Sequence, residues 1–457
     1  MSAAALAQGY RAGAFSPVEV ALAALARAGQ AQARCNAFTR IDHSGALATA
    51  QAAQARLRAG APLGVLDGIP VTIKDIVWVQ GWPAGYGSRA PALMPAEDAP
   101  AVAQLRAAGC VFIGQTTTPE FGWKAVTDSP ACGITRNPWN PGLTPGGSSG
   151  GAAVAAAMGA GVLHLGSDGG GSIRIPASFT GIVGHKPTFG LVPAYPPSAF
   201  GTVAHVGPMA RSVADVALML DAISGRDLRD WHQNTQAYPR SAGQSPMSLA
   251  GARIGVWATP AQGEVAPVIS ALFSQWQARL AGLGAVLEPV ELPGEDLPGM
   301  FHVLWFSGAA ARLRALPAAA LPNLDPGLRD IAEVGAGFSA ADYIAASTRR
   351  AAFGAAFDTL LARYDFLLSP AVPILPFAAG QEVPPGSGMA RWTEWAGFSF
   401  PVNLAQAPAC VIPAGASPDG LPIGLQIIGA RGADRKVLAA AAALSASPAG
   451  NEYANRP

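Results

Sequence analysis

The sequence alternates short apolar runs with longer segments in which alanine and leucine recur at helical spacing. Ser16-Pro17-Val18-Glu19 joins a cap residue, a proline at the first helical position and a glutamate at N3, and this capping box predicts a helix from residue 17. Further helices are predicted at 47–58, 101–108, 151–158, from 213 onward, at 266–283 and at 339–363. Short apolar runs predict strands at 71–73, 111–113, 162–165, 253–257, 286–292 and 366–368.

Strands that alternate with helices indicate an α/β fold in which helices cover both faces of a sheet. No internal repeat is visible, and the two irregular stretches, 224–251 and 370–388, are too short and too little biased to be domain linkers. We therefore expect a single large domain over residues 1–457. The second stretch is followed by Arg391-Trp392-Thr393-Glu394-Trp395, and this combination predicts a loop beside a binding site.

Composition and charge exclude several classes of protein. Charged residues make up 13% and hydrophobic residues 50% of the chain, which predicts a large buried core. A net charge of +1 without a Lys/Arg stripe argues against a nucleic-acid partner. The N-terminus lacks the pattern of a signal peptide, and the uncharged stretch between Arg136 and Asp168 is Ala/Gly-rich, as in a buried helix rather than a membrane span.

The cysteines predict a reducing, cytoplasmic environment, and the lysines include one in an unusual place. Four scattered cysteines form no metal-binding pattern and are expected to be buried free thiols, so we predict no metal and no other cofactor. Only four of the 30 basic residues are lysines, and Lys74 ends an apolar strand. Such a lysine is ordinarily a surface residue at a strand exit, but burial would lower its pKa and leave it neutral, which arginine cannot achieve.

Two Gly/Ser-rich runs, 145–151 and 166–174, are the strongest candidates for chemistry. Glycine at this density lets several backbone N–H groups face inward around a serine, as an acyl-transfer site requires for its oxyanion. Tight turns or a phosphate-binding nest are the alternatives. Neither run carries the lysine of a phosphate loop, and no GxGxxG pattern occurs.

A rival interpretation makes Ser148 the nucleophile of an esterase, because residues 146–150 match G-x-S-x-G. That elbow must follow a strand, whereas three prolines lie between residues 137 and 145. Its base would be a histidine, and none of the candidates stands in a recognisable loop; they are His164, His185, His205, His232 and His302. The pattern therefore disfavours this alternative.

Three separated motifs in order resemble the amidase signature family of serine hydrolases: GIPVTIKD with Lys74, PGGSSGG at 145–151 and GSDGGGSIRIPASFTG at 166–181. The resemblance continues through the runs 184–190, 207–213 and 420–426, so it covers nearly the whole chain. It implies one large domain with a mixed, mostly parallel twisted central sheet covered by helices. The signature core would span about 65–215 and a substrate-shaping region about 225–400.

The resemblance also implies a Ser–cis-Ser–Lys catalytic set. Ser172 would be the nucleophile, Ser148 the bridging serine on a cis peptide and Lys74 the base. Backbone N–H groups around Gly169, Gly170, Gly171 and Ser172 would form the oxyanion hole. Ser149 would support the loop, and Asp168 and Arg174 would form an ion pair or a backbone brace. The chain departs from the family at three places. The family commonly has threonine where this chain has Ser167 and usually has a branched residue where it has Gly169, and residues 115–117 also differ from the family's pattern.

Substrate choice is expected to depend on aromatic residues outside the motifs. At helical spacing most of these are predicted to lie in the core, and any that line a pocket would select an apolar or aromatic small molecule. Arg391 is a candidate for binding an acid. The aromatic candidates are Trp78, Trp82, Tyr86, Phe301, Trp305, Phe306, Trp392, Trp395, Phe398 and Phe400.

The predicted reaction is hydrolysis of a C–N bond in an amide, anilide or carbamate (urethane) through an acyl-enzyme, with esterase or urethanase activity possible for the same site. The alternatives are a glutamine-hydrolysing amidotransferase subunit, the G-x-S-x-G esterase and a non-enzymatic relative, the last disfavoured because all three triad positions are filled. We expect a monomer or homodimer with no membrane partner.

Overall fold

Eleven strands form the main sheet of the protein, in the order β1-β3-β2-β6-β8-β7-β12-β13-β11-β9-β10. A computed structural model describes residues 1–233 and 246–446. The strands are β1 (Phe38–Ile41), β2 (Pro70–Lys74), β3 (Val111–Thr116), β6 (Leu163–Asp168), β7 (Val183–Lys186), β8 (His205–Ala210), β9 (Arg253–Val256), β10 (Val286–Pro289), β11 (Phe366–Pro370), β12 (Ala409–Ala416) and β13 (Pro422–Ile428). A separate ribbon joins β4 (Asp128–Ser129) to β5 (Gly133–Ile134).

The sheet is mixed, as expected, but its parallel pairings occupy two flanks. Strand β2 pairs in parallel with β3 and β6, and β9 with β10 and β11. The other neighbouring pairs are antiparallel and include the whole centre, from β6 through β13. The expectation of a mostly parallel sheet therefore holds only at the flanks. Strands β12 and β13 follow one another through a short turn, which permits only an antiparallel pair.

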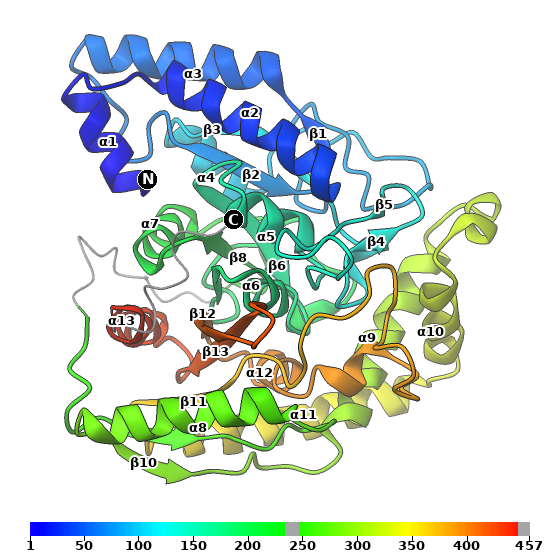
Figure 1. Ribbon diagram of the computed structural model, residues 1–457. Coiled ribbons are helices and arrows are strands. Elements are labelled where there is room, and N and C mark those ends of the chain that lie inside the picture. Colours follow the sequence, from blue (N-terminus) through cyan, green and yellow to red (C-terminus); the bar gives the residue numbers. More distant parts are fainter. Residues whose placement is uncertain (234–245, 447–457) are drawn as a thin grey trace.

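Helices cover both faces of this sheet; in Figure 1 its strands follow one another from top to bottom, and the helices of the two faces lie to the left and right of the central strands. Several begin or end within a few residues of the predicted bounds, and the capping box of Ser16 and Glu19 is present. The helices are α1 (Ala3–Arg11), α2 (Pro17–Cys35), α3 (His43–Arg58), α4 (Pro100–Ala107), α5 (Gly150–Ala157), α6 (Arg174–Thr180), α7 (Val213–Ile223), α8 (Pro267–Gly282), α9 (Leu297–Arg314), α10 (Pro326–Ala336), α11 (Ala340–Leu361), α12 (Phe400–Leu404) and α13 (Asp434–Ser445).

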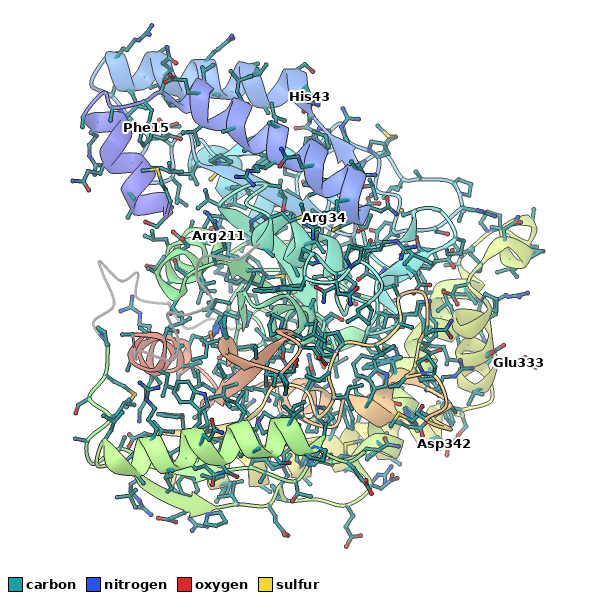
Figure 2. All side chains as sticks on the ribbon, viewed as in Figure 1. Phe15, Arg34, His43, Arg211, Glu333 and Asp342 are labelled. Carbon is teal, nitrogen blue, oxygen red and sulfur yellow. The ribbon has the colours of Figure 1, made fainter. Side chains whose placement is uncertain are left out.

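Two large apolar clusters lie on the two faces of the sheet, and the side chains of β11 and β12 alternate between them. Leu367 of β11 lies in the cluster beside α5 and α9, while Phe366 and Leu368 lie in the cluster beside α7 and α13. A third, smaller cluster lies between α2, α3 and β3. Side chains occupy the space between the sheet and its helices (Figure 2). No helix within the described ranges is long and apolar enough to cross a membrane.

Helix α5 confirms the interpretation of the uncharged stretch as a buried helix. All of its residues are buried, and it packs against the neighbouring strands β3, β2, β6 and β8 in one half of the sheet. Its small side chains let the backbone approach the strands closely; a Cβ atom on Gly151 would lie 2.5 Å from the backbone nitrogen of Thr117. This close approach brings the start of α5 to the carboxyl ends of β2 and β6.

Candidate active site

Two parallel strands end at one edge of the sheet and place Lys74 beside Ser167. Lys74 is the last residue of β2, and β6 ends at Ser167 and Asp168 with Ile73 opposite Leu165. The chain preceding α5 brings Ser148 and Ser149 to the same edge. A site at the carboxyl ends of parallel strands is the usual arrangement in α/β proteins.

Lys74 is completely buried among hydroxyl groups. Its Nζ lies 2.6 Å from Oγ of Ser148, 3.0 Å from Oγ of Ser149 and 3.0 Å from Oγ of Ser167. No carboxylate is among its hydrogen-bond partners within the described residues. Burial therefore lowers the pKa of Lys74 well below its usual value, and the charge of Asp168 opposes this only in part. The amine is thus poised to be neutral.

The hydrogen bonds of Ser149 assign the protons around this amine. Ser149 Oγ donates to the carbonyl oxygen of Ser167 at 3.0 Å, so towards Lys74 it acts as an acceptor. Ser148 Oγ has no partner other than Lys74 among the described residues. A neutral amine has two N–H groups and one lone pair, which match two accepting hydroxyls and one donating hydroxyl. Ser148 and Ser167 each lack another hydroxyl partner among the described residues, so either of these two hydroxyls can donate into the lone pair.

The Gly147–Ser148 peptide bond is cis, as the resemblance implies. Gly146 before it has a φ of +77°, a conformation that favours glycine. A Cβ atom on Gly147 would lie 2.5 Å from the backbone of Val126, so no side chain fits there. The glycines of this run therefore let the chain turn tightly against Val126 and present Ser148 to Lys74.

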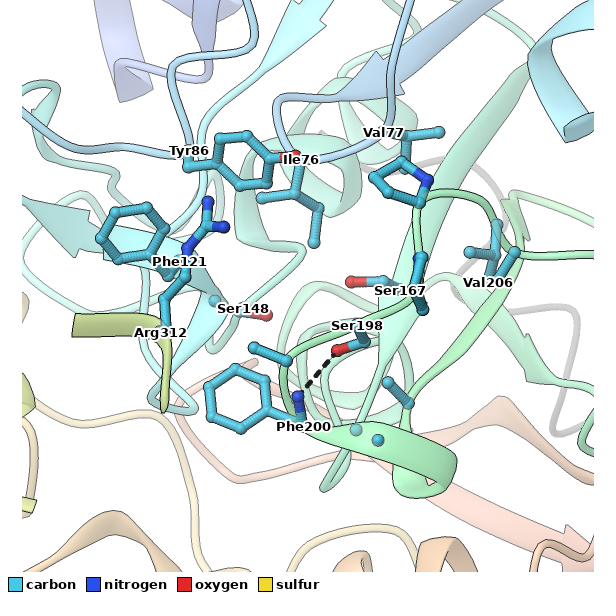
Figure 3. A pocket seen from close by; sticks show the side chains of 18 of the residues that line it. Ile76, Val77, Tyr86, Phe121, Ser148, Ser167, Ser198, Phe200, Val206 and Arg312 are labelled. Atoms are coloured by element: carbon cyan, nitrogen blue, oxygen red, sulfur yellow. Dashed lines mark hydrogen bonds between the residues drawn. The ribbon is translucent and has the colours of Figure 1, made fainter. Parts of the chain in front are cut away.

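Ser172 lies in the loop between β6 and α6 and shares one pocket with Ser148 and Ser167. Its carbonyl oxygen accepts the N–H of Ser149 at 3.0 Å, which ties the two serine loops together. Within the described ranges no hydrogen bond joins the hydroxyls of Ser172 and Ser148. The hydroxyls of Ser148 and Ser167 point toward one another across the pocket (Figure 3).

The three glycines before Ser172 differ in what their N–H groups contact. Gly171 donates to Oδ1 of Asp168 at 2.8 Å, because that buried carboxylate needs donors. The N–H groups of Gly169, Gly170 and Ser172 have no acceptor among the residues that the structure describes. The free donors of this loop are thus Gly169, Gly170 and Ser172, rather than Gly171.

Asp168 and Arg174 form a fully buried ion pair behind this loop, as predicted. Arg174 Nε lies 2.9 Å from Oδ2 of Asp168, and its other nitrogens donate to Asn403 and Gln426. Burial alone would raise the pKa of Asp168, but the charge and hydrogen bonds of Arg174 hold it below its usual value. Every charge in this group has partners, so it braces the loop.

Large aromatic rings lie directly against the glycine loop. A Cβ atom on Gly169 would lie 2.8 Å from the ring of Trp305, and one on Gly170 would lie 2.6 Å from the ring of Trp392. Trp305 also stacks on Phe200 with ring centroids 3.7 Å apart. The family that the sequence resembles usually has a branched residue at position 169. The glycine found here leaves room for Trp305, which lines the pocket.

The pocket has a volume of about 430 Å³ and a largely apolar wall. Of the predicted aromatic residues, Trp78, Tyr86 and Trp305 line it, and the others are buried in the core, as expected for most of them. Sequence reasoning missed Phe121, Phe189, Phe200 and Arg312. The aromatic and proline-rich run 189–201 was the signal available for two of them, Phe189 and Phe200.

The loop expected beside the site at 370–388 does not line the pocket, and neither does the run 391–395. Arg391 contacts the carboxylates of Asp330 and Glu382, so its charge is used within the fold and is not available for a substrate acid. The G-x-S-x-G alternative loses its structural support, since no strand precedes Ser148 and no histidine in the described part of the chain hydrogen-bonds to it. Nor do the described residues hold a cluster of three or more potential metal ligands.

Comparison with known proteins defines the family. The sequence profile of the amidase family matches residues 19–438. The chain is 35% identical to a glutamyl-tRNA(Gln) amidotransferase subunit from Symbiobacterium thermophilum, covering 96% of this chain and 95% of that protein. It is 34% identical to an acylamidase of Rhodococcus erythropolis, over 97% and 94% of the two chains.

A solved structure agrees with these sequence matches. A bacterial aryl acylamidase of the amidase signature family superposes with a TM-score of 0.92 at 27% identity, covering 100% of this chain and 99% of the other. The chain therefore belongs to the amidase signature family. It is an amidase-type enzyme that acts on C–N bonds of small substrates.

Proposed function

We propose that the protein hydrolyses apolar or aromatic amides, anilides or carbamates through an acyl-enzyme on Ser172. The observation that carries this proposal is the buried Lys74 with its three hydroxyl partners, in the same pocket as Ser172. A buried lysine without a contacting carboxylate is a base near neutral pH. The largely apolar wall of the pocket favours an apolar or aromatic substrate.

In the first step, Ser148 passes its proton to the lone pair of Lys74 and takes the proton of Ser172. The Ser172 oxygen attacks the substrate carbonyl, and the C–O bond forms as the carbonyl becomes an oxyanion. The N–H groups of Gly169, Gly170 and Ser172 are the proposed donors for that oxyanion, since Gly171 is already bonded to Asp168. Ser148 then returns a proton to the leaving nitrogen as the C–N bond breaks.

In the second step, water attacks the acyl group and the same relay removes its proton. Release of the acid regenerates Ser172 and neutral Lys74. A carbamate presents the same carbonyl and leaving nitrogen. Loss of its amine leaves a carbonate ester on Ser172, and hydrolysis of that ester releases a carbonic acid half-ester that loses carbon dioxide to give the alcohol. The relay therefore serves amide and urethane substrates alike.

A glutamine-hydrolysing amidotransferase component is the second candidate, favoured by relatives with an amidotransferase name at 35% identity. Ammonia would then pass to a second protein, and free glutamine would have to bind through its charged α-groups. The mostly apolar wall of the pocket fits this substrate less well. Release of amines from simple anilides by the isolated chain, with no glutaminase activity, would exclude obligate partnership.

Mass spectrometry of the enzyme with a slowly deacylating O-aryl carbamate, whose phenolate leaves when the serine attacks the carbonyl, tests the nucleophile. We expect one added carbamoyl group on the peptide that contains Ser172, and none on Ser172→Ala, which also loses hydrolysis while its circular dichroism stays normal. Near-full activity of Ser172→Ala together with an inactive Ser148→Ala would refute the proposal in favour of Ser148. A panel of amides, anilides, esters and carbamates then ranks the substrates.

A further inference from the structure

Arg312 places a positive charge inside this largely apolar pocket. It lies in the last turn of α9 and lines the same pocket as Ser148 and Ser172. Its guanidinium lies 4.9 Å from the ring centroid of Tyr86 and 4.5 Å from that of Phe121. Figure 3 shows these three side chains together on the Ser148 side of the pocket. Within residues 1–233 and 246–446, no carboxylate lies in salt-bridge range of this guanidinium.

Two other partly buried arginines, Arg391 and Arg350, each have several partners within the fold. Arg391 contacts two carboxylates, and Arg350 donates to the carbonyl oxygens of Leu404 and Thr202 and to the Thr202 hydroxyl. A guanidinium carries its charge at every accessible pH and has five N–H donors in a planar fork. Two aromatic faces stack on the guanidinium of Arg312 but leave the donors along its edge without a carboxylate.

The remaining charges around the pocket do not compete for Arg312. Asp230 is the one carboxylate among the described lining residues, and its oxygens accept the backbone N–H groups of Ala194 and His232. His205 is buried and its pKa is lowered, because burial and then the charge of Lys186 disfavour protonation. Among the described lining residues, Arg312 is therefore the one with a permanent positive charge for an anionic substrate group.

We propose that Arg312 is a specificity-determining residue that binds a carboxylate on the substrate, so that the preferred substrates are amides or carbamates with an acidic group and an otherwise apolar body. Tyr86 and Phe121 hold the guanidinium against their rings, and a side-chain hydrogen bond between Arg312 and Tyr86 uses one of its donors. The remaining N–H donors are available for a charge-assisted contact with the carboxylate. The assignment rests on the proposed acyl-enzyme chemistry, since it names the substrate class of that site.

Two 4-nitroanilides of matched shape test the assignment, the glutaryl compound with a free carboxylate and the uncharged 5-methylhexanoyl compound. Arg312→Gln should lower the ratio of kcat/KM for the acid over the neutral substrate by about 10- to 100-fold, since it removes a charge-assisted contact. Arg312→Lys should restore part of the ratio. Arg314→Gln, an exposed arginine two residues on that does not line the pocket, is the control and should leave the ratio unchanged.

Binding measured by calorimetry on Ser172→Ala separates this assignment from the proposed reaction. Selective binding of the acid that is lost with Arg312→Gln, without turnover by the native enzyme, would refute the hydrolysis of such anilides and keep the carboxylate site. Turnover with an unchanged ratio in Arg312→Gln would overturn the carboxylate site alone and leave Arg312 as a packing residue. Absence of binding by either compound would also overturn it.

Discussion

Two buried lysines of this protein have opposite surroundings. Lys74 contacts three serine hydroxyls, whereas Lys124 contacts the carboxylates of Asp128 at 2.7 Å and Asp325 at 2.9 Å. Burial lowers the pKa of both, but the two carboxylates raise the pKa of Lys124 above its usual value, while that of Lys74 stays well below. The neighbours of a buried amine, rather than its burial, decide whether it is a base or a structural cation.

The largest effect is expected on catalytic activity, when each of the two lysines is replaced. Lys74→Met and Lys74→Arg should each lower kcat/KM for anilide hydrolysis by about 10⁴-fold, because neither side chain can accept and return a proton near neutral pH. Lys124→Arg, which keeps its charge beside two carboxylates, is the control and should stay near the native rate. Substantial activity in Lys74→Arg would show that charge alone suffices, and the comparison would fail.

A carboxylate placed beside Lys74 should give this lysine the kind of surroundings that Lys124 has. Ser167→Asp brings an acid to the position whose hydroxyl now lies 3.0 Å from Nζ. Its charge raises the pKa of Lys74, so we expect activity at pH 7 to fall about 100-fold and to return as the pH rises. Ser167→Asn, with the same shape and no charge, should keep the native pH profile.

The native enzyme gives the reference profile for this shift. Activity should fall as the pH drops through the lowered pKa of Lys74, because the protonated amine cannot accept the Ser148 proton. A flat profile from about pH 5 to 9 would contradict a titrating base. An unchanged profile in Ser167→Asp would place the base elsewhere.

The smallest effect on catalysis, and the clearest on stability, is expected at Lys124. Lys124→Met leaves Asp128 and Asp325 without their cation and should lower the free energy of unfolding by about 3 kcal/mol, with little change in the activity of the folded enzyme. Lys74→Met removes an amine that is already neutral and should change the free energy of unfolding by about 1 kcal/mol. Urea unfolding followed by circular dichroism measures both.

The pH dependence of unfolding should have opposite signs at the two lysines. Unfolded Lys74 holds a proton that the folded protein lacks, so its contribution to stability increases with pH from the lowered pKa up to about 10.4, by at most about 1.4 kcal/mol per unit. The pKa of Lys124 is raised, so its contribution is complete below about 10.4 and is lost as the pH rises through the folded value. Equal slopes in the two Met variants would contradict this.

The sequence predicted the residues around Lys74 better than the walls of the pocket. Lys74, Ser148 and Ser172 lie in three local sequence motifs. Asp168 and Arg174 lie at the end of β6 and the start of α6, on either side of one short loop. The helical spacing of the aromatic residues correctly indicated that most are core.

Features that depend on packing between distant segments escaped prediction. Arg312 follows three alanines near the end of a helix, as a solvated arginine would, and reaches the pocket only because α9 lies against the loop of Tyr86. The bond that occupies the Gly171 N–H depends on how the loop folds back on Asp168. Arg391 looked free in the sequence because its partners, Asp330 and Glu382, are distant or in an irregular loop.

The contact between Gly169 and Trp305 has a consequence for anyone who wishes to redesign the enzyme. Replacing Trp305 to admit bulkier substrates also removes the ring against which the backbone of the Gly169 loop packs. Mutational libraries that vary position 305 alone will therefore mix gains in access with losses in rate. Libraries that vary 169 and 305 together, pairing a larger residue at one with a smaller residue at the other, can separate the two.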